Sequence, residues 1–204
     1  MSTENSFLLT QARESLSGRW GMAIATFLIY ILITGAIAMP KAGIISLLIS
    51  GPMMLGAATV ALSFARDQDV RLEQIFDGFK HFGTAILTYV IMVVFIFLWM
   101  LLLIVPGIIA ALSYSMSFYI LADNKALKAM EVLETSKQMM DGHKLKLFYL
   151  YLRFLGLAIL CIFTLGIGFL WLIPYMYVTT AKFYDDIKGL VQEESQTYKE
   201  ADIV

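Results

Sequence analysis

Arg153 is the residue that stands out first, because it is the single charged side chain well inside a long hydrophobic segment. A charge at the centre of a bilayer costs roughly 2.5–3.5 kcal/mol on insertion scales, so such residues are candidates for function. Arg153 nevertheless follows Lys144 by only a few turns of helix. We therefore favour a side chain that reaches outward to the interface, beside Tyr149 or Tyr151, over a functional charge.

Two histidines and one cysteine are the other side chains that could bind a metal or act as a nucleophile. His81 and His143 each lie shortly after a glycine, and no carboxylate or cysteine spacing completes a metal site around them. We expect both to be polar anchors at an interface. Cys161 lies between Leu160 and Ile162, so we expect a buried, inert thiol, because a reactive thiolate needs a positive and wetter setting.

Polar residues at the ends of the hydrophobic segments, and within them, allow two interpretations. Asp123, Asp185 and Asp186 could line a vestibule, or, more simply, Asp123 or Asn124 could cap the helix that follows. Hydroxyl side chains could line a polar path, or they could serve close contact between helices in a membrane. These hydroxyl residues are Ser63, Ser113, Ser115, Ser117, Thr179 and Thr180.

The sequence contains no constellation that is typical of catalysis. A Ser/His/Asp set, a pair of acid and base carboxylates and a nucleotide-binding motif are all missing from it. Gly166 and Gly168 are too sparse for a phosphate loop and are interpreted as a turn. We therefore expect no catalytic, cofactor-binding or metal-binding residues and no cofactor, and enzyme is the least favoured class.

The composition indicates an integral membrane protein. Of 204 residues, 59% are hydrophobic and only 15% are charged, whereas soluble domains carry roughly 45–50% apolar and about 25% charged residues. The formal net charge of −1 gives no reason to expect a nucleic acid partner. The N-terminal segment lacks the apolar core of a cleaved signal peptide, so we expect the first hydrophobic segment to insert permanently.

Long segments without charges predict six transmembrane helices, since a helix needs about 20 residues to cross the hydrocarbon core. Residues 20–40 and 42–65 give one pass each, and residues 82–122, broken at Pro106-Gly107, give two. Residues 147–181 give two short passes, broken either within residues 164–168 or at Pro174. The predicted fold is all-α and polytopic.

An amphipathic segment precedes each pair of passes, and this order of elements predicts three repeats. The segments are residues 7–17, 70–77 and 125–141, and each ends at a glycine, namely Gly18, Gly78 or Gly142, where a left-handed residue would end a helix. In the second segment Leu72, Ile75, Phe76 and Phe79 share one helical face. We expect a single membrane domain, 1–204, with repeats at about 6–66, 70–124 and 125–188 and a polar tail at 189–204.

The cations predict the orientation. Apart from Lys41, at the first turn, and Arg153, the fifteen Lys and Arg residues lie on the side of the amphipathic segments and the two termini. The positive-inside rule places that side in the cytoplasm, so both termini are expected there.

Three blocks of the chain resemble the bacterial domain-of-unknown-function 975 family of integral membrane proteins. Residues 98–109 (LWMLLLIVPGII) and the polar end at 120–124 resemble its central signature, and residues 136–148 (SKQMMDGHKLKLF) and 164–171 (TLGIGFLW) resemble two further blocks. The family has an acidic residue and a serine where this chain has Tyr151 and Arg153, so no role is transferred to them. The resemblance implies the bacterial cytoplasmic membrane and no established activity.

Two functions remain for this sequence. The first is a non-enzymatic structural, lipid-interacting or regulatory protein of the bacterial cytoplasmic membrane, with membrane lipids as partners and a membrane protein or a second copy as a possible partner. The alternative is a small transporter or channel, because repeats with Gly/Pro-interrupted passes are a feature of transporters. Against a proton pathway, the passes hold no Asp or Glu.

Overall fold

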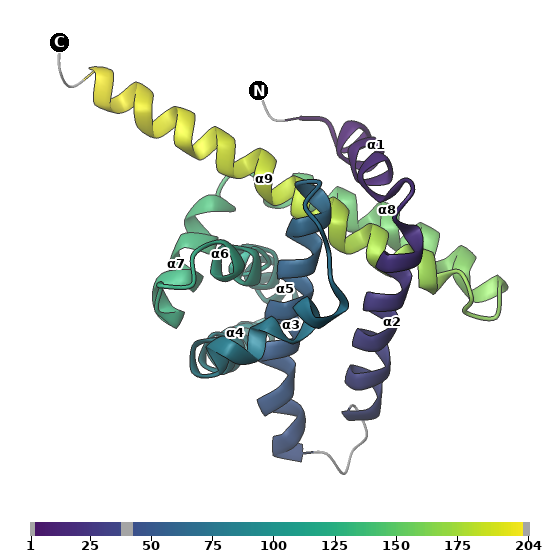
Figure 1. The fold of residues 1–204 in the computed structure, drawn as a ribbon. Helices are drawn as coiled ribbons and strands as arrows, with labels where there is room; N and C mark the ends of the chain where they lie inside the picture. Colours follow the sequence, from purple (N-terminus) through teal and green to yellow (C-terminus); the bar gives the residue numbers. More distant parts are fainter. Residues whose placement is uncertain (1–2, 38–42, 202–204) are drawn as a thin grey trace.

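The structure, a computed structural model, describes residues 3–37 and 43–201, and all regular secondary structure in them is helical (Figure 1). The all-α prediction is confirmed for this part of the chain. Lys41, the cation predicted at the first turn, lies outside the described residues.

The first hairpin joins α2 (Trp20–Ile37) to α3 (Gly43–Ala65) and is preceded by α1 (Asn5–Leu16). The axes of α1 and α2 differ by 100°. Gly18 forms the corner with φ +74°, the left-handed conformation that was predicted for it. Leu8, Ala12 and Leu16 lie on one face of α1 and are buried, as the helical period requires.

The second hairpin contains η2 (Leu72–His81), α4 (Phe82–Leu102), α5 (Ile104–Ser113) and α6 (Ser117–Asp123). The predicted break at Pro106-Gly107 is displaced, because the chain turns at Leu103 instead. Pro106 occupies the first turn of α5, where a backbone N–H has no partner within the helix and proline is tolerated. Gly107 packs closely against Met100 across the turn.

The third hairpin pairs α8 (Lys144–Phe163) with the long helix α9 (Phe169–Ala201) and is preceded by α7 (Ala129–Met139). Gly142 joins α7 to α8 with φ +73°, as predicted. The turn between the passes lies at residues 164–168, and Pro174 lies inside α9. The first of the two predicted break points is therefore the correct one.

Gly78 is where the sequence interpretation was wrong. It lies inside η2, a 3₁₀-helix, and is not among the residues with positive φ. A Cβ at Gly78 would overlap the carbonyl oxygen of Pro52, and one at Gly56 would overlap that of Ile75. These glycines let the backbones of η2 and α3 touch. The sequence also predicted that Ile75 and Phe76 share one apolar face of this helix. In the structure Ile75 is buried, whereas Phe76 is 45% exposed.

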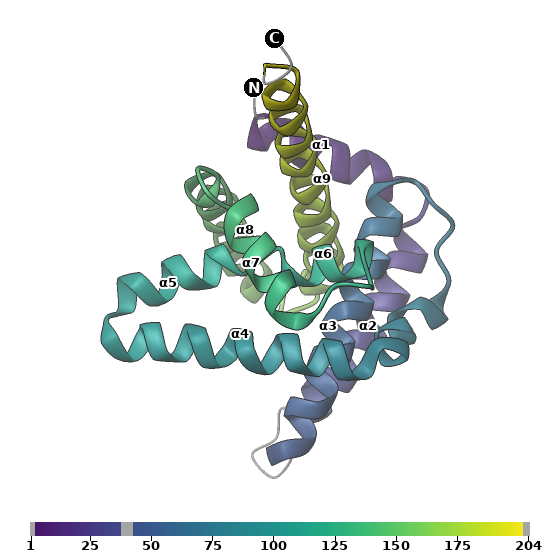
Figure 2. The same ribbon diagram turned by 90° about the vertical axis from the view of Figure 1, so that its left-hand side faces the viewer.

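The three hairpins leave a common centre in different directions. In Figure 1 the α2–α3 hairpin points down and the α8–α9 hairpin points right, and in Figure 2 the α4–α5 hairpin extends to the left. The helix before each hairpin packs on another hairpin: α1 on α9, η2 on α3, and α7 on both α6 and α4. The first long helix of each hairpin also contacts another hairpin, since α2 contacts α9, α4 contacts α3 and α8 contacts α5.

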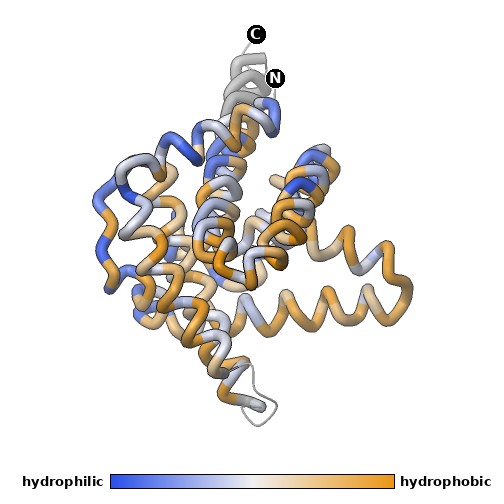
Figure 3. The backbone as a smooth tube through the Cα atoms, turned by 90° about the vertical axis from the view of Figure 1, so that its right-hand side faces the viewer, coloured by the Kyte–Doolittle hydropathy of each residue, from blue (hydrophilic) through white to orange (hydrophobic). Residues whose placement is uncertain are grey.

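Burial divides the molecule into a packed centre and apolar projections. The halves of the second passes nearest the centre are buried, including Met53, Phe64, Leu121, Val178 and Phe183. The hairpin ends are exposed and apolar, with Leu101 at 75%, Phe163 at 82% and Leu165 at 94%. Figure 3 shows hydrophobic colour over the hairpins and hydrophilic colour near the N-terminus.

Four helices of the described residues are long and apolar enough to cross a membrane, by length and composition alone: Ile45–Ala65, Leu72–Leu102, Ile104–Asp123 and Lys144–Phe163. The bent pair of α1 and α2 adds a fifth if it is counted as one span. The apolar part of α9 is short, because Lys182 follows soon after its start at Phe169. These spans indicate a membrane protein, and six passes remain a prediction.

Candidate functional site: an ion cluster where the hairpins meet

Arg66 follows α3 directly and binds carboxylates on two other elements. Its Nη1 donates a hydrogen bond to Asp123 Oδ1 at 2.6 Å, and its Nη2 donates to Asp185 Oδ1 at 2.7 Å. Asp123 ends α6 and Asp185 lies on α9, so one guanidinium joins all three hairpins. The planar fork of arginine suits this task because it presents several donors in fixed directions.

Asp123 also accepts hydrogen bonds on its second oxygen. The Tyr184 hydroxyl donates to Oδ2 at 3.1 Å, and the Lys188 ammonium donates to the same atom. Arg66, Asp123, Asp185 and Lys188 are here called the central ion cluster. Its two cations balance its two carboxylates. Hydrogen bonds with Asp185 and then Asp123 raise the pKa of the Arg66 guanidinium above its ordinary value, so the cation is held charged.

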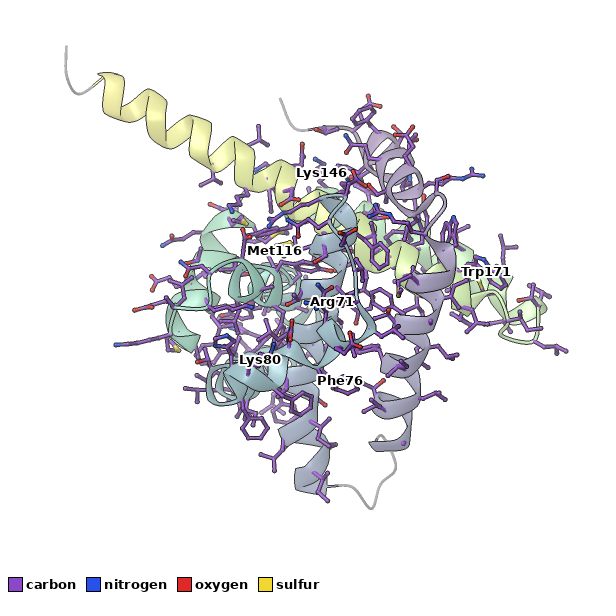
Figure 4. The ribbon with its side chains drawn as sticks, in the orientation of Figure 1. Arg71, Phe76, Lys80, Met116, Lys146 and Trp171 are labelled. Carbon is purple, nitrogen blue, oxygen red and sulfur yellow. The ribbon has the colours of Figure 1, made fainter. Side chains whose placement is uncertain are left out.

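Two further ion pairs flank the central ion cluster. Arg19, at the corner between α1 and α2, pairs with Asp67 and also donates to the Phe64 carbonyl at 3.3 Å. Lys146 of α8 pairs with Asp186 of α9 at 2.6 Å, and their side chains are only 15% and 12% exposed. Lys146 lies on the side of the molecule from which α9 extends (Figure 4). Both pairs tie the start of a first pass to the end of a second pass.

An aromatic cluster lies beside the central ion cluster and was not predicted from the sequence. The rings of Phe27 and Tyr177 are 4.9 Å apart, and the Tyr177 hydroxyl donates to the Tyr30 hydroxyl at 3.0 Å. Tyr119 donates to the Tyr177 carbonyl at 3.3 Å and stacks on Tyr184. These contacts join residues far apart in sequence, and no local pattern signals them.

The central ion cluster connects elements of all three hairpins through paired charges. Each of its charged groups has an oppositely charged partner on another hairpin. Within residues 3–37 and 43–201, no group of three or more His, Cys, Asp or Glu side chains is arranged to hold a metal ion.

Of the polar residues predicted at the ends of the hydrophobic segments, the three aspartates form ion pairs, and neither Asp123 nor Asn124 caps the next helix. Asp123, Asp185 and Asp186 belong to ion pairs. Glu131 accepts a hydrogen bond from the Lys128 N–H at the start of α7, and Asn124 instead forms a turn with Ala126.

Arg153 is exposed and lies beside the N-terminal segment. Together with Thr3, Asn5, Lys146 and Tyr149 it lines a hollow of about 420 Å³. Its side chain thus lies among polar residues, as the outward-reaching interpretation requires. Tyr149, not Tyr151, shares that hollow.

The histidines and the cysteine are not brought together at one site. His81 ends η2, and His143 immediately precedes α8. Cys161 is partly buried near the end of α8, where its Sγ packs against Gly168.

The hydroxyl residues bond mostly within their own helices. Four of them donate to the carbonyl four residues earlier, at 2.7–3.1 Å: Ser63, Ser113, Thr179 and Thr180. Ser115 donates to Leu112, and the buried Ser117 hydroxyl has no partner among the described residues. These bonds favour helix packing over a polar path.

Comparison with known proteins gives one match. A family model described as "Protein of unknown function (DUF975)" matches residues 1–113 and 100–191. No curated protein matches the chain, and no solved structure matches it.

Proposed function

We propose a function from the premise that the chain belongs to the DUF975 family of unknown function, whose model covers nearly all of it, as the sequence resemblance predicted. The protein is a non-enzymatic component of the bacterial cytoplasmic membrane that interacts with the surrounding lipid and holds three apolar hairpins in it. The exposed apolar hairpin ends carry this proposal, because soluble proteins rarely expose large contiguous apolar patches.

The proposed topology has six passes in three repeats, with both termini in the cytoplasm. The cyclic order of contacts supports the repeats, since each amphipathic helix packs on the second pass of the preceding repeat. Arg66, Asp123 and Asp185 stand at matching positions near the ends of the three second passes. A repeat of one unit around the central ion cluster accounts for both observations.

The diverging hairpins would deform the bilayer around them. α2 has 18 residues and α4 has 21, so at 1.5 Å per residue their lengths are about 27 and 32 Å. A helix of this length spans the roughly 30 Å hydrocarbon core only if it stands perpendicular to the membrane plane. Hairpins that point in different directions cannot all be upright. Their tilt shortens their reach, and the bilayer is expected to thin locally to match.

The transporter alternative has less support. The second passes meet in a packed centre of buried residues such as Met53, Leu121 and Val178. The hydroxyl groups that could line a path bond within their own helices.

Reconstitution in bilayers of different thickness tests the proposal. Thermal unfolding should be measured in phosphatidylcholine nanodiscs whose monounsaturated chains run from 14 to about 22 carbons. We expect the highest unfolding temperature in the thin bilayers and a steady fall as thickness increases. A flat profile, or greatest stability in the thickest bilayer, would contradict local thinning.

A further inference from the structure

A groove lies where α7 meets the second hairpin. It consists of a cavity of about 490 Å³ and an adjoining cavity of about 200 Å³. Both cavities are lined by Tyr114, Lys137 and Lys144, so they are continuous at these residues. Ser136 of α7 donates a buried hydrogen bond to the Ser113 carbonyl at 2.8 Å and thus fixes α7 against the wall of the groove.

One end of the groove is apolar and opens toward the surface that would face lipid. Trp99 and Ile109 line it, and their side chains are each 48% exposed. The neighbouring Leu98 of α4 and Leu103 at the turn are 55% and 65% exposed. A hydrocarbon chain along this end would cover apolar surface without leaving the membrane.

The other end of the groove is lined by charged side chains of both signs that form no close, buried ion pairs with the residues that the structure describes. Lys137 and Glu134 form no ion pair within 4 Å in the described part of the chain. Lys144 pairs with Asp141 at 3.6 Å, and the Asp141 side chain is 87% exposed, so this contact contributes little. Two cations and two carboxylates therefore line one cavity.

We propose that this groove binds a phospholipid whose headgroup carries both a phosphate and an ammonium group, as phosphatidylethanolamine does. The phosphate lies between Lys137 and Lys144, the ammonium lies near Glu134, and one acyl chain lies over Trp99 and Ile109. The mixed charge of the lining favours this headgroup over a purely anionic one, since two carboxylates would repel a net negative charge. This proposal rests on the proposed interaction of the protein with lipid, and it specifies the class of lipid that is bound.

Native mass spectrometry tests the site on the full-length protein. The detergent-purified protein is incubated with dioleoyl phosphatidylethanolamine or dioleoyl phosphatidylglycerol, and retained lipid is counted. We expect preferential retention of phosphatidylethanolamine. The double variant Lys137→Gln/Lys144→Gln should reduce that retention at least fivefold, and Glu134→Gln should move the preference toward phosphatidylglycerol.

The control is Lys125→Gln/Lys128→Gln, which changes two exposed lysines near the same helix that line neither cavity. It should retain lipid as the unaltered protein does, and circular dichroism checks that every variant is folded. Equal retention in the groove and control variants, or a preference of the unaltered protein for phosphatidylglycerol, would overturn the site. Bilayer-thickness dependence is independent of this groove, so the proposed function could still stand.

Discussion

At the scale of single residues, Arg66 joins carboxylates from the two hairpins that it does not belong to. It donates to carboxylates that are 57 and 119 positions away in the chain, and together with Asp123 it links all three hairpins. Its removal would leave Asp123 and Asp185 as neighbouring like charges without their shared partner. We therefore regard the central ion cluster as the clamp that keeps the second passes together.

Replacement of Arg66 by Met should lower the free energy of unfolding by about 1–3 kcal/mol, since hydrogen bonds to charged groups contribute on this order. The lower part of the range is expected because the Arg66 side chain is 31% exposed to solvent. Thermal unfolding in detergent, followed by circular dichroism, measures the change. Arg71→Met, at an exposed arginine, is the control, and an equal effect of the two variants would contradict a clamp at Arg66.

The sequence pointed to half of this cluster. Asp123 and Asp185 were singled out because they end hydrophobic segments, but Arg66 was counted only among the cations that set the orientation. Which cation pairs with which carboxylate depends on how the hairpins pack, and no local spacing encodes that. The same reason hid the contact of Tyr30 with Tyr177, which are 147 positions apart.

At the scale of elements, η2 approaches α3 so closely that the two backbones touch. Two glycines, Gly56 and Gly78, bring backbone against backbone there. Small residues at such crossings are what membrane helices use for packing, because lipid provides no hydrophobic force between them.

Gly78→Ala should therefore destabilise the protein strongly, by roughly the 1–3 kcal/mol that overpacking typically costs, because its Cβ would collide with the Pro52 backbone. Gly83→Ala is the matched control, since a Cβ at Gly83 meets nothing within 4 Å and alanine favours the helix by about 0.5–1 kcal/mol. Urea unfolding in a mild detergent compares the two. If Gly78→Ala is as stable as Gly83→Ala, the close approach of η2 and α3 is wrong.

Helix positions were predictable from the sequence to within a few residues, and so were the breaks at Gly18, Gly142 and residues 164–168, but the breaks near Gly78 and Pro106 were not. Charge-free runs located α2, α3, α4 and α8, because a hydrophobic run is a strong local signal. The break was expected at Pro106 and found at Leu103, because proline is compatible with a first turn. Gly78 was expected to be left-handed, since the sequence does not distinguish a turn glycine from a packing glycine.

At the scale of the whole molecule, the divergence of the hairpins is the feature that sequence reasoning could not supply. Charge-free runs in the sequence indicate which segments are apolar, but they do not determine the angle between one hairpin and the next. That angle follows from the central ion cluster and the contacts of Gly56 and Gly78, which are tertiary, whereas the corner at Gly18 is local and was predicted. Because the hairpins diverge, we expect the protein to thin the surrounding bilayer locally, whereas upright helices would leave its thickness unchanged.

The most direct test of this account is the accessibility of single cysteines in cells. In a Cys161→Ser background, cysteines are placed at Leu103 and Leu165, in the hairpin turns, and at Asp69 and Asn124, on the opposite side. A membrane-impermeant maleimide should label the turn positions in intact spheroplasts and the other two only after permeabilisation. Reversed labelling, or turn positions that react from neither side, would contradict three hairpins that cross the membrane from the cytoplasm.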